Sequence, residues 1–197
     1  MPNTLLALTF ALLTSMAPAP QPVAATGPSP MVLAEGRAAR KAHLRETTRR
    51  KTWALIDFDR DWREPRFWVL DAETDAVRWT GHVRHAGASN DDRTGRAVYC
   101  SNVPGSFKSS PGSYLTAAAP YLGKFGRSLR VRGLDSGVND QALARDIVLH
   151  PAGALAYSLG CFMVPDGEVA AAVDQLAGGT FLYVAGCRAP DAADREP

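Results

Sequence analysis

Six short segments rich in strand-forming residues, separated by turn residues, recur along this chain between residues 53 and 185. They are residues 53–59, 66–71, 76–85, 127–133, 145–150 and 180–185. Segments of this length and composition are typical of β-strands. The first three follow one another through short connections, which predicts an antiparallel meander. We therefore expect a mainly β domain with one or two short helices.

Helical character is clearest just before the last of these strands. Asp166 is a candidate N-cap for residues 167–177, which are rich in Ala and Val, and Gly178 is expected to end the helix. Residues 86–128 are instead rich in Gly, Ser and Pro and lack periodicity. A long loop region of this kind in a compact domain is usually functional or mobile.

The N-terminus has the features of an export signal. Residues 5–13 form an apolar run too short to span a bilayer, and small residues offer a cleavage site after Ala25. We expect residues 1–25 to be a signal peptide that directs the protein to the periplasm or cell envelope, although no Lys or Arg precedes the run. The alternatives are a disordered tail rich in Ala and Pro, or an uncleaved leader that tethers the domain to a membrane.

The remaining regions follow from composition. Residues 26–51 are rich in Pro and Ala and then basic, and we interpret them as a linker with room for a solvated helix. A cationic arm that contacts an anionic surface is the alternative. Residues 52–187 form the expected domain and 188–197 a polar tail; with 197 residues, one domain is the natural size. The net charge of only +2 gives no reason to expect nucleic acid as a partner, and we expect a monomer.

The chain has three cysteines, Cys100, Cys161 and Cys187. In an exported protein, Cys100 and Cys187 can form a disulfide while Cys161 stays free. The alternative is that Cys100 and Cys187 are only small buried residues.

Cys161 lies in a Ser-Leu-Gly-Cys turn, eleven positions after His150. Pro151 disfavours helical geometry at His150 and keeps it extended at the end of a strand. A thiol with a pKa of roughly 8.5 is mostly protonated at neutral pH, so a nearby imidazole is needed to form the thiolate. Gly160 allows a close backbone approach to a substrate, so the amides of Gly160 and Cys161 are candidate oxyanion donors. Ser158 would either orient the imidazole or support the turn.

Metal and nucleotide sites are not expected. The chain contains no Cys-x-x-Cys or His-x-x-x-His pattern, and His82 and His85 point to opposite faces if their segment is a strand. Gly123-Lys124 lacks the other positions of a phosphate-binding loop. We therefore expect no cofactor.

Several ordered blocks of this sequence resemble the murein L,D-transpeptidase catalytic domain family, in its YkuD-related branch. The blocks are residues 66–74, 85–89, 101–112, 126–134, 137–140, 147–150 and 158–165. The resemblance covers residues 53–185 and implies a β-rich sandwich or barrel. It also implies that Cys161 is the nucleophile and His150 the general base, acting on peptidoglycan stem peptides through a thioester without a cofactor. His85 lies in one matching block and is a candidate residue of the substrate groove.

Three functions follow from these observations. The leading one is an exported cysteine acyltransferase that passes a stem peptide to an amine. The second is a carboxypeptidase or hydrolase of the same bonds, because the connection from His150 to Cys161 is shorter than in the family and carries Leu159 before Gly160. The third is a catalytically silent module that binds the cell wall.

Overall fold

The structure is a computed structural model and describes residues 27–187. The expected signal peptide (residues 1–25) and the polar tail (188–197) lie outside the described residues. The elements within them are α1 (Pro30–Ala42), β1 (Arg49–Asp57), β2 (Phe67–Asp71), β3 (Val77–Gly81), the short 3₁₀ helix η1 (Gly87–Ser89), β4 (Asn90–Asp91), β5 (Arg96–Ala97), β6 (Gly112–Thr116), β7 (Tyr121–Gly123), β8 (Gly126–Gly133), β9 (Val148–Pro151), β10 (Phe162–Val164), α2 (Asp166–Leu176) and β11 (Thr180–Ala185).

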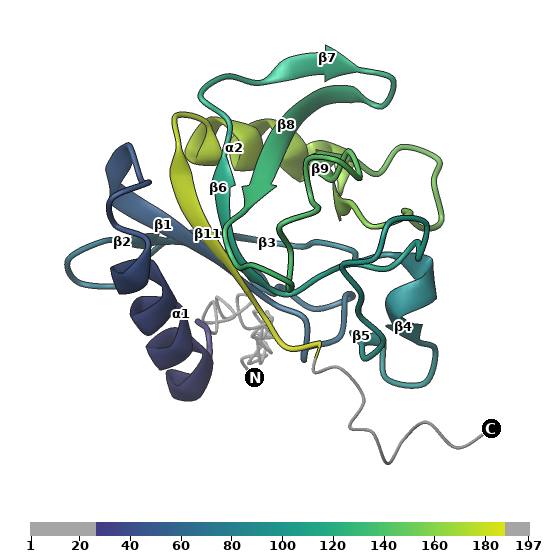
Figure 1. Ribbon diagram of the computed structural model, residues 1–197, viewed down its shortest axis with the longest axis horizontal. Helices are drawn as coiled ribbons and strands as arrows, with labels where there is room; N and C mark the ends of the chain where they lie inside the picture. The colour runs from purple at the N-terminus through teal and green to yellow at the C-terminus, as the bar shows by residue number, and fades with distance from the viewer. Residues whose placement is uncertain (1–26, 188–197) are drawn as a thin grey trace, which may run out of the picture.

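One nine-stranded sheet forms the body of the protein (Figure 1). Its order is β10-β9-β8-β6-β11-β1-β2-β3, with β7 paired to β8, while β4 and β5 form a separate two-stranded sheet. Neighbours are antiparallel except for β1 with β11 and β9 with β10. The predicted mainly β fold and the antiparallel β1-β2-β3 meander are confirmed.

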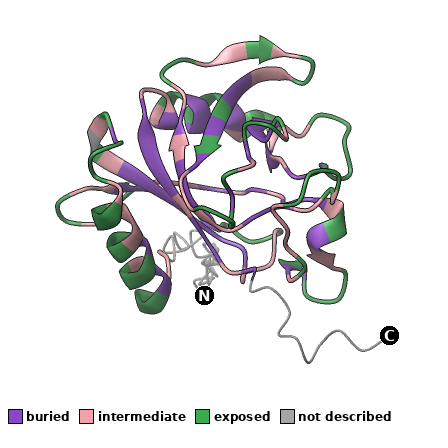
Figure 2. Ribbon diagram, viewed as in Figure 1, coloured by how far each residue is buried: buried purple, intermediate pink, exposed green. Residues whose placement is uncertain are grey.

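Both faces of the central strands are covered, and Figure 2 shows these strands as largely buried. Successive residues of a strand point to opposite faces, so β1 contributes to two apolar clusters. Ala54 and Ile56 belong to the larger cluster, which includes residues of α2, whereas Trp53 and Leu55 belong to the smaller one beside α1. This arrangement leaves the β8-β9-β10 end of the sheet to carry the site described below.

Helix α1 corrects the interpretation of residues 26–51 as a linker. The helix begins after Ser29, whose Oγ accepts a hydrogen bond from the Val32 amide at 3.3 Å, and Val32 is buried against the sheet. Gly36 lets the ring of Trp53 come close, since a Cβ there would lie 2.7 Å from that ring. Val32 and Gly36 are the only buried residues of the described helix, and Leu33 and Ala39 are only partly buried against the same cluster, so the sequence shows no continuous apolar stripe.

Strand β6 lies inside residues 86–128, which were expected to form a long loop region. It lies between β8 and β11, and its Tyr114 is fully buried, with the hydroxyl donating to the Ser110 carbonyl at 2.9 Å. Its first residues, Gly112 and Ser113, have the composition of a turn rather than of a strand.

Several boundaries also differ from the sequence prediction, among them that of the segment 145–150, whose strand begins only at Val148. The strand predicted at residues 76–85 ends at Gly81. Helix α2 starts at Asp166 with Pro165 in the N-cap position, and the Asp166 carboxylate instead accepts a hydrogen bond from the Gly153 amide at 2.8 Å. That bond ties the connection between β9 and β10 to the start of α2.

Cys100 and Cys187 form a disulfide, with their Cα atoms 5.7 Å apart, and Cys161 is free. This agrees with the expected pairing. The disulfide joins Cys100, in the loop that precedes β6, to Cys187, which lies two residues after the end of β11. Neither helix in residues 27–187 is long and apolar enough to cross a membrane.

Candidate active site

The pairing of β9 with β10 brings the thiol and the imidazole to one end of the sheet. Phe162 pairs with Leu149 and Met163 with His150 in parallel register. Cys161, which immediately precedes β10, therefore lies beside Val148, two residues before His150 on β9. Cys161 and His150 line the same cavity of about 820 Å³. The structure thus brings together the two residues that the sequence singled out.

Three parts of the chain make the walls of this cavity. They are the β7-β8 hairpin, the residues that lead into β9, and the connection 154–159 between β9 and β10. The charged and the large apolar or aromatic side chains of these walls include Lys124, Phe125, Arg130, Arg145, Asp146, Tyr157 and Leu159. Tyr157 and Leu159 are 61% and 59% exposed, so this wall is open toward solvent. Residues 27–187 contain no group of three or more His, Cys, Asp or Glu arranged to hold a metal ion.

His150 is held as a neutral imidazole, and only one of its ring nitrogens has a hydrogen-bond partner within residues 27–187. Its Nδ1 lies 2.7 Å from the carbonyl oxygen of Pro151, which can only accept, so Nδ1 carries the proton. Nε2 is therefore the basic nitrogen. The ring is buried and stacks on Phe125 with centroids 4.5 Å apart. Burial lowers the pKa of His150 below its usual value, so the imidazole is neutral at pH 7.

Cys161 is half-buried, and its thiol contacts the carbonyl oxygen of Asp146 at 3.6 Å. Burial raises the pKa of the Cys161 thiol, because desolvation disfavours the thiolate. The resting pair is consequently a neutral thiol beside a neutral imidazole, not a preformed ion pair.

Ser158 supports the turn that carries the cysteine. Its Oγ donates to the Cys161 carbonyl at 2.8 Å and accepts from the Gly160 amide at 3.4 Å. No hydrogen bond between Ser158 and His150 is seen among the described residues. Of the two roles expected for Ser158, the structure favours support of the turn. To donate a hydrogen bond to an oxyanion, the Gly160 amide would have to break its long hydrogen bond to Ser158 Oγ.

A polar network that the sequence did not predict also holds this turn in place. Arg145 donates to the Ser101 carbonyl at 2.8 Å, to Ser110 Oγ at 3.2 Å and to the Lys108 carbonyl. Ser109 Oγ in turn donates to the Gly160 carbonyl at 3.1 Å. Arg145 therefore positions the loop that holds the backbone next to Cys161. The available signal was an arginine at the start of the predicted strand 145–150, in a chain that also carries a loop rich in Ser.

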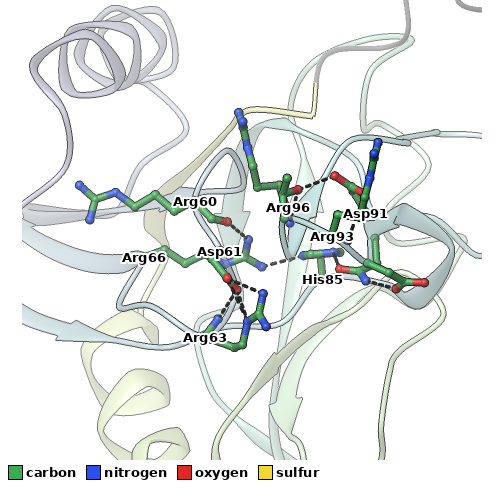
Figure 3. A network of polar contacts seen from close by, with 11 residues as sticks. Arg60, Asp61, Arg63, Arg66, His85, Asp91, Arg93 and Arg96 are labelled. Carbon is green, nitrogen blue, oxygen red and sulfur yellow. Dashed lines mark hydrogen bonds and ion pairs between the residues drawn. The ribbon is translucent and has the colours of Figure 1, made fainter.

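His85 lies outside the cavity of Cys161. It lines a neighbouring cavity of about 580 Å³, which shares Tyr157 and Leu159 with the first one. Arg66 donates to His85 Nδ1 at 2.7 Å, so Nε2 carries the proton and donates to Asn90 Oδ1 at 3.0 Å (Figure 3). The ring is only 4% exposed, and both nitrogens are engaged within the protein. The ring is thus held within the protein, beside the neighbouring cavity and not in that of Cys161.

We predict that His85 makes the protein acid-sensitive. Burial, with the positive charge of Arg66, lowers the pKa of His85 to about 3 from an ordinary 6.5. As the pH falls, His85 is therefore protonated in the unfolded chain before it is protonated in the folded protein. The free energy of unfolding that is present above pH 6.5 is lost as the pH falls toward 3, by roughly 1.4 kcal/mol per pH unit. Urea unfolding at several pH values checks this. A His85→Gln variant should be less stable at pH 7 but lose stability less steeply, and an equally steep loss would contradict the assignment.

Gly160 is predicted to be irreplaceable at the turn. Its φ is +132°, and a Cβ would lie 2.5 Å from Ile147 Cδ1 and 3.2 Å from Arg145 Nη2. Gly160→Ala should cost about 2 kcal/mol or more of unfolding free energy and displace Cys161. Gly167→Ala is the matched control, because nothing lies within 4 Å of that Cβ and α2 should gain slightly. Thermal unfolding of both variants checks this prediction. Equal melting temperatures of the two variants would contradict it.

Fold and cavity together define a β-sheet domain with a cysteine–histidine site at the end of the sheet. The family model described as L,D-transpeptidase catalytic domain matches residues 27–185. The chain belongs to this family, whose members are enzymes that act on peptidoglycan outside the cytoplasm. None of the curated proteins compared with the chain matches it.

The chain is also similar to several solved structures. An L,D-transpeptidase from Stackebrandtia nassauensis is 13% identical with a TM-score of 0.43, over 80% of this chain and 66% of that one. L,D-transpeptidase 1 from Mycobacterium tuberculosis is 14% identical with a TM-score of 0.40, over 69% and 62%. The helical cell shape determining protein Pgp2 from Campylobacter jejuni is 7% identical with a TM-score of 0.46, over 68% and 48%. The chain thus spans less than two thirds of the length of each.

Proposed function

We propose that this protein is an exported cysteine acyltransferase that acts on the stem peptides of peptidoglycan. The observation that carries the proposal is the placement of Cys161 in the same cavity as a neutral His150 whose Nδ1 proton is fixed by the Pro151 carbonyl. This leaves Nε2 free to accept a proton on the side of the ring away from that carbonyl. Membership of the family supplies the substrate class.

The reaction follows from the protonation states of the resting site. As Cys161 Sγ attacks the carbonyl carbon of a peptide bond, His150 Nε2 takes the thiol proton. The oxyanion is stabilised by the backbone amide of Cys161, and by that of Gly160 if its bond to Ser158 opens. When the intermediate collapses, His150 returns the proton to the departing amine and a thioester remains on Cys161.

The thioester is then attacked by an acceptor, with His150 again taking a proton. If the acceptor is an amine of a second peptide, the enzyme is a transpeptidase. If the acceptor is water, the enzyme is a hydrolase. The open wall formed by Tyr157 and Leu159 favours keeping hydrolysis as the second candidate, because both side chains are more than half exposed and leave water access to the cavity.

Incubation with a disaccharide-tetrapeptide, followed by product analysis, tests the proposal. Cross-linked dimers identify a transpeptidase, and shortened monomers alone identify a hydrolase. The absence of both products and of any acyl-enzyme, together with peptidoglycan binding that survives in Cys161→Ala, would instead identify a silent wall-binding module.

A further inference from the structure

The cavity of Cys161 contains three cationic side chains, Lys124, Arg130 and Arg145. Two of them are already occupied. Arg130 pairs with Asp146 and lies over the ring of Tyr121, and Arg145 is held by the loop 101–110. Lys124 is different, because no carboxylate pairs with it among residues 27–187 and its ammonium group contacts only a ring there.

That ring places Lys124 next to the catalytic pair. Lys124 lies in the turn of the β7-β8 hairpin, with Nζ 4.7 Å from the centroid of Phe125. Phe125 stacks in turn on His150, at 4.5 Å. Lys124 is exposed, so its ammonium group is free to meet a ligand that enters the cavity. An unpaired ammonium at the lip of a reactive cavity is suited to a negatively charged group.

The chemistry of the substrate identifies that group, given the proposed function. If the residue expelled is the last of the peptide, its carboxylate is joined to the attacked carbonyl carbon through only a nitrogen and a Cα. Standard bond lengths place the two carbon atoms less than about 4 Å apart. A cation that recognises this carboxylate must therefore lie at the edge of the cavity that holds Sγ, where Lys124 is found. Carboxylates elsewhere in the donor peptide are farther from the attacked carbon.

We propose that Lys124 binds the terminal carboxylate of the donor peptide and so restricts cleavage to the last peptide bond. The inference rests on the proposed function for the identity of the substrate. It has a consequence for the base as well. After burial, the positive charge of Lys124 is the next effect that lowers the pKa of His150. A bound carboxylate would neutralise this charge. A donor with a free C-terminus thus favours protonation of His150, while it also removes a positive charge that lowers the pKa of the Cys161 thiol.

The experiment compares a tetrapeptide with a free C-terminus and its C-terminal amide. Binding is measured by isothermal titration calorimetry to a Cys161→Ala protein, so that no turnover interferes. We expect the free acid to bind about 10-fold more tightly than the amide, as for a hydrogen bond to a charged group. Adding Lys124→Gln should remove this preference, and Lys124→Arg should retain it. Lys41→Gln is the control, since it removes the same charge from the exposed surface of α1.

Each outcome decides the inference. Equal binding of acid and amide, a preference that survives Lys124→Gln, or no binding of either peptide would overturn it. Turnover of the tetrapeptide by the unmodified protein is measured separately. Turnover without a preference leaves the proposed function standing and removes the role of Lys124. A preference without turnover leaves the carboxylate site standing and removes the proposed reaction.

Discussion

Replacing Cys161 with alanine should abolish acyl transfer, with a fall in turnover of about 10⁴-fold or more. The sulfur is the atom that would form the thioester, and Cys161 is the only thiol among the described residues that line its cavity. Intact-mass measurement after incubation with the tetrapeptide should show an acyl adduct on the unmodified protein and none on the variant.

The same substitution should leave the fold intact. The thiol is a weak donor, 3.6 Å from the Asp146 carbonyl and also bonded to the backbone of Val148, so little stability depends on these contacts. His150→Gln is the companion variant, expected to lose about 10²- to 10⁴-fold because the nucleophile remains but its proton acceptor does not. An adduct that forms at the normal rate in a folded Cys161→Ala protein would show that another residue is the nucleophile.

The second large effect is expected from the disulfide. Cys100 and Cys187 are 87 residues apart, and closing a loop of that length restricts the unfolded chain by roughly 4–5 kcal/mol in the chain-entropy model. A Cys100→Ser/Cys187→Ser variant should therefore unfold at a clearly lower urea concentration. We would make it in a Cys161→Ala background, so that the free thiol cannot form a new bond.

A reductant supplies the control for this prediction. It should lower the stability of the Cys161→Ala protein and leave that of the double serine variant unchanged, because only the former has a bond to reduce. Equal unfolding free energies with and without the bond would show that the unfolded chain is already restricted in some other way.

The segments with strong β composition were predictable from the sequence, and β11 was predicted with its observed boundaries. β6 and α1 were not, because Gly112 and Gly36 serve contacts that exist only in the folded protein. The same holds for the site. The residue types and the turn identified Cys161 and His150, whereas the partners of Arg145 and the second cavity around His85 depend on how distant loops meet.

The position of β11 has a consequence for how the protein is made. This strand comes last in the described chain, yet it lies between β6 and β1, parallel to β1 and antiparallel to β6. Until it is available, β1 and β6 each present an unpaired edge, which is a hazard for aggregation. The central pairing joins segments more than a hundred residues apart, so the fold has many non-local contacts and should form slowly. Synthesis of the domain must therefore be nearly complete before its sheet can close.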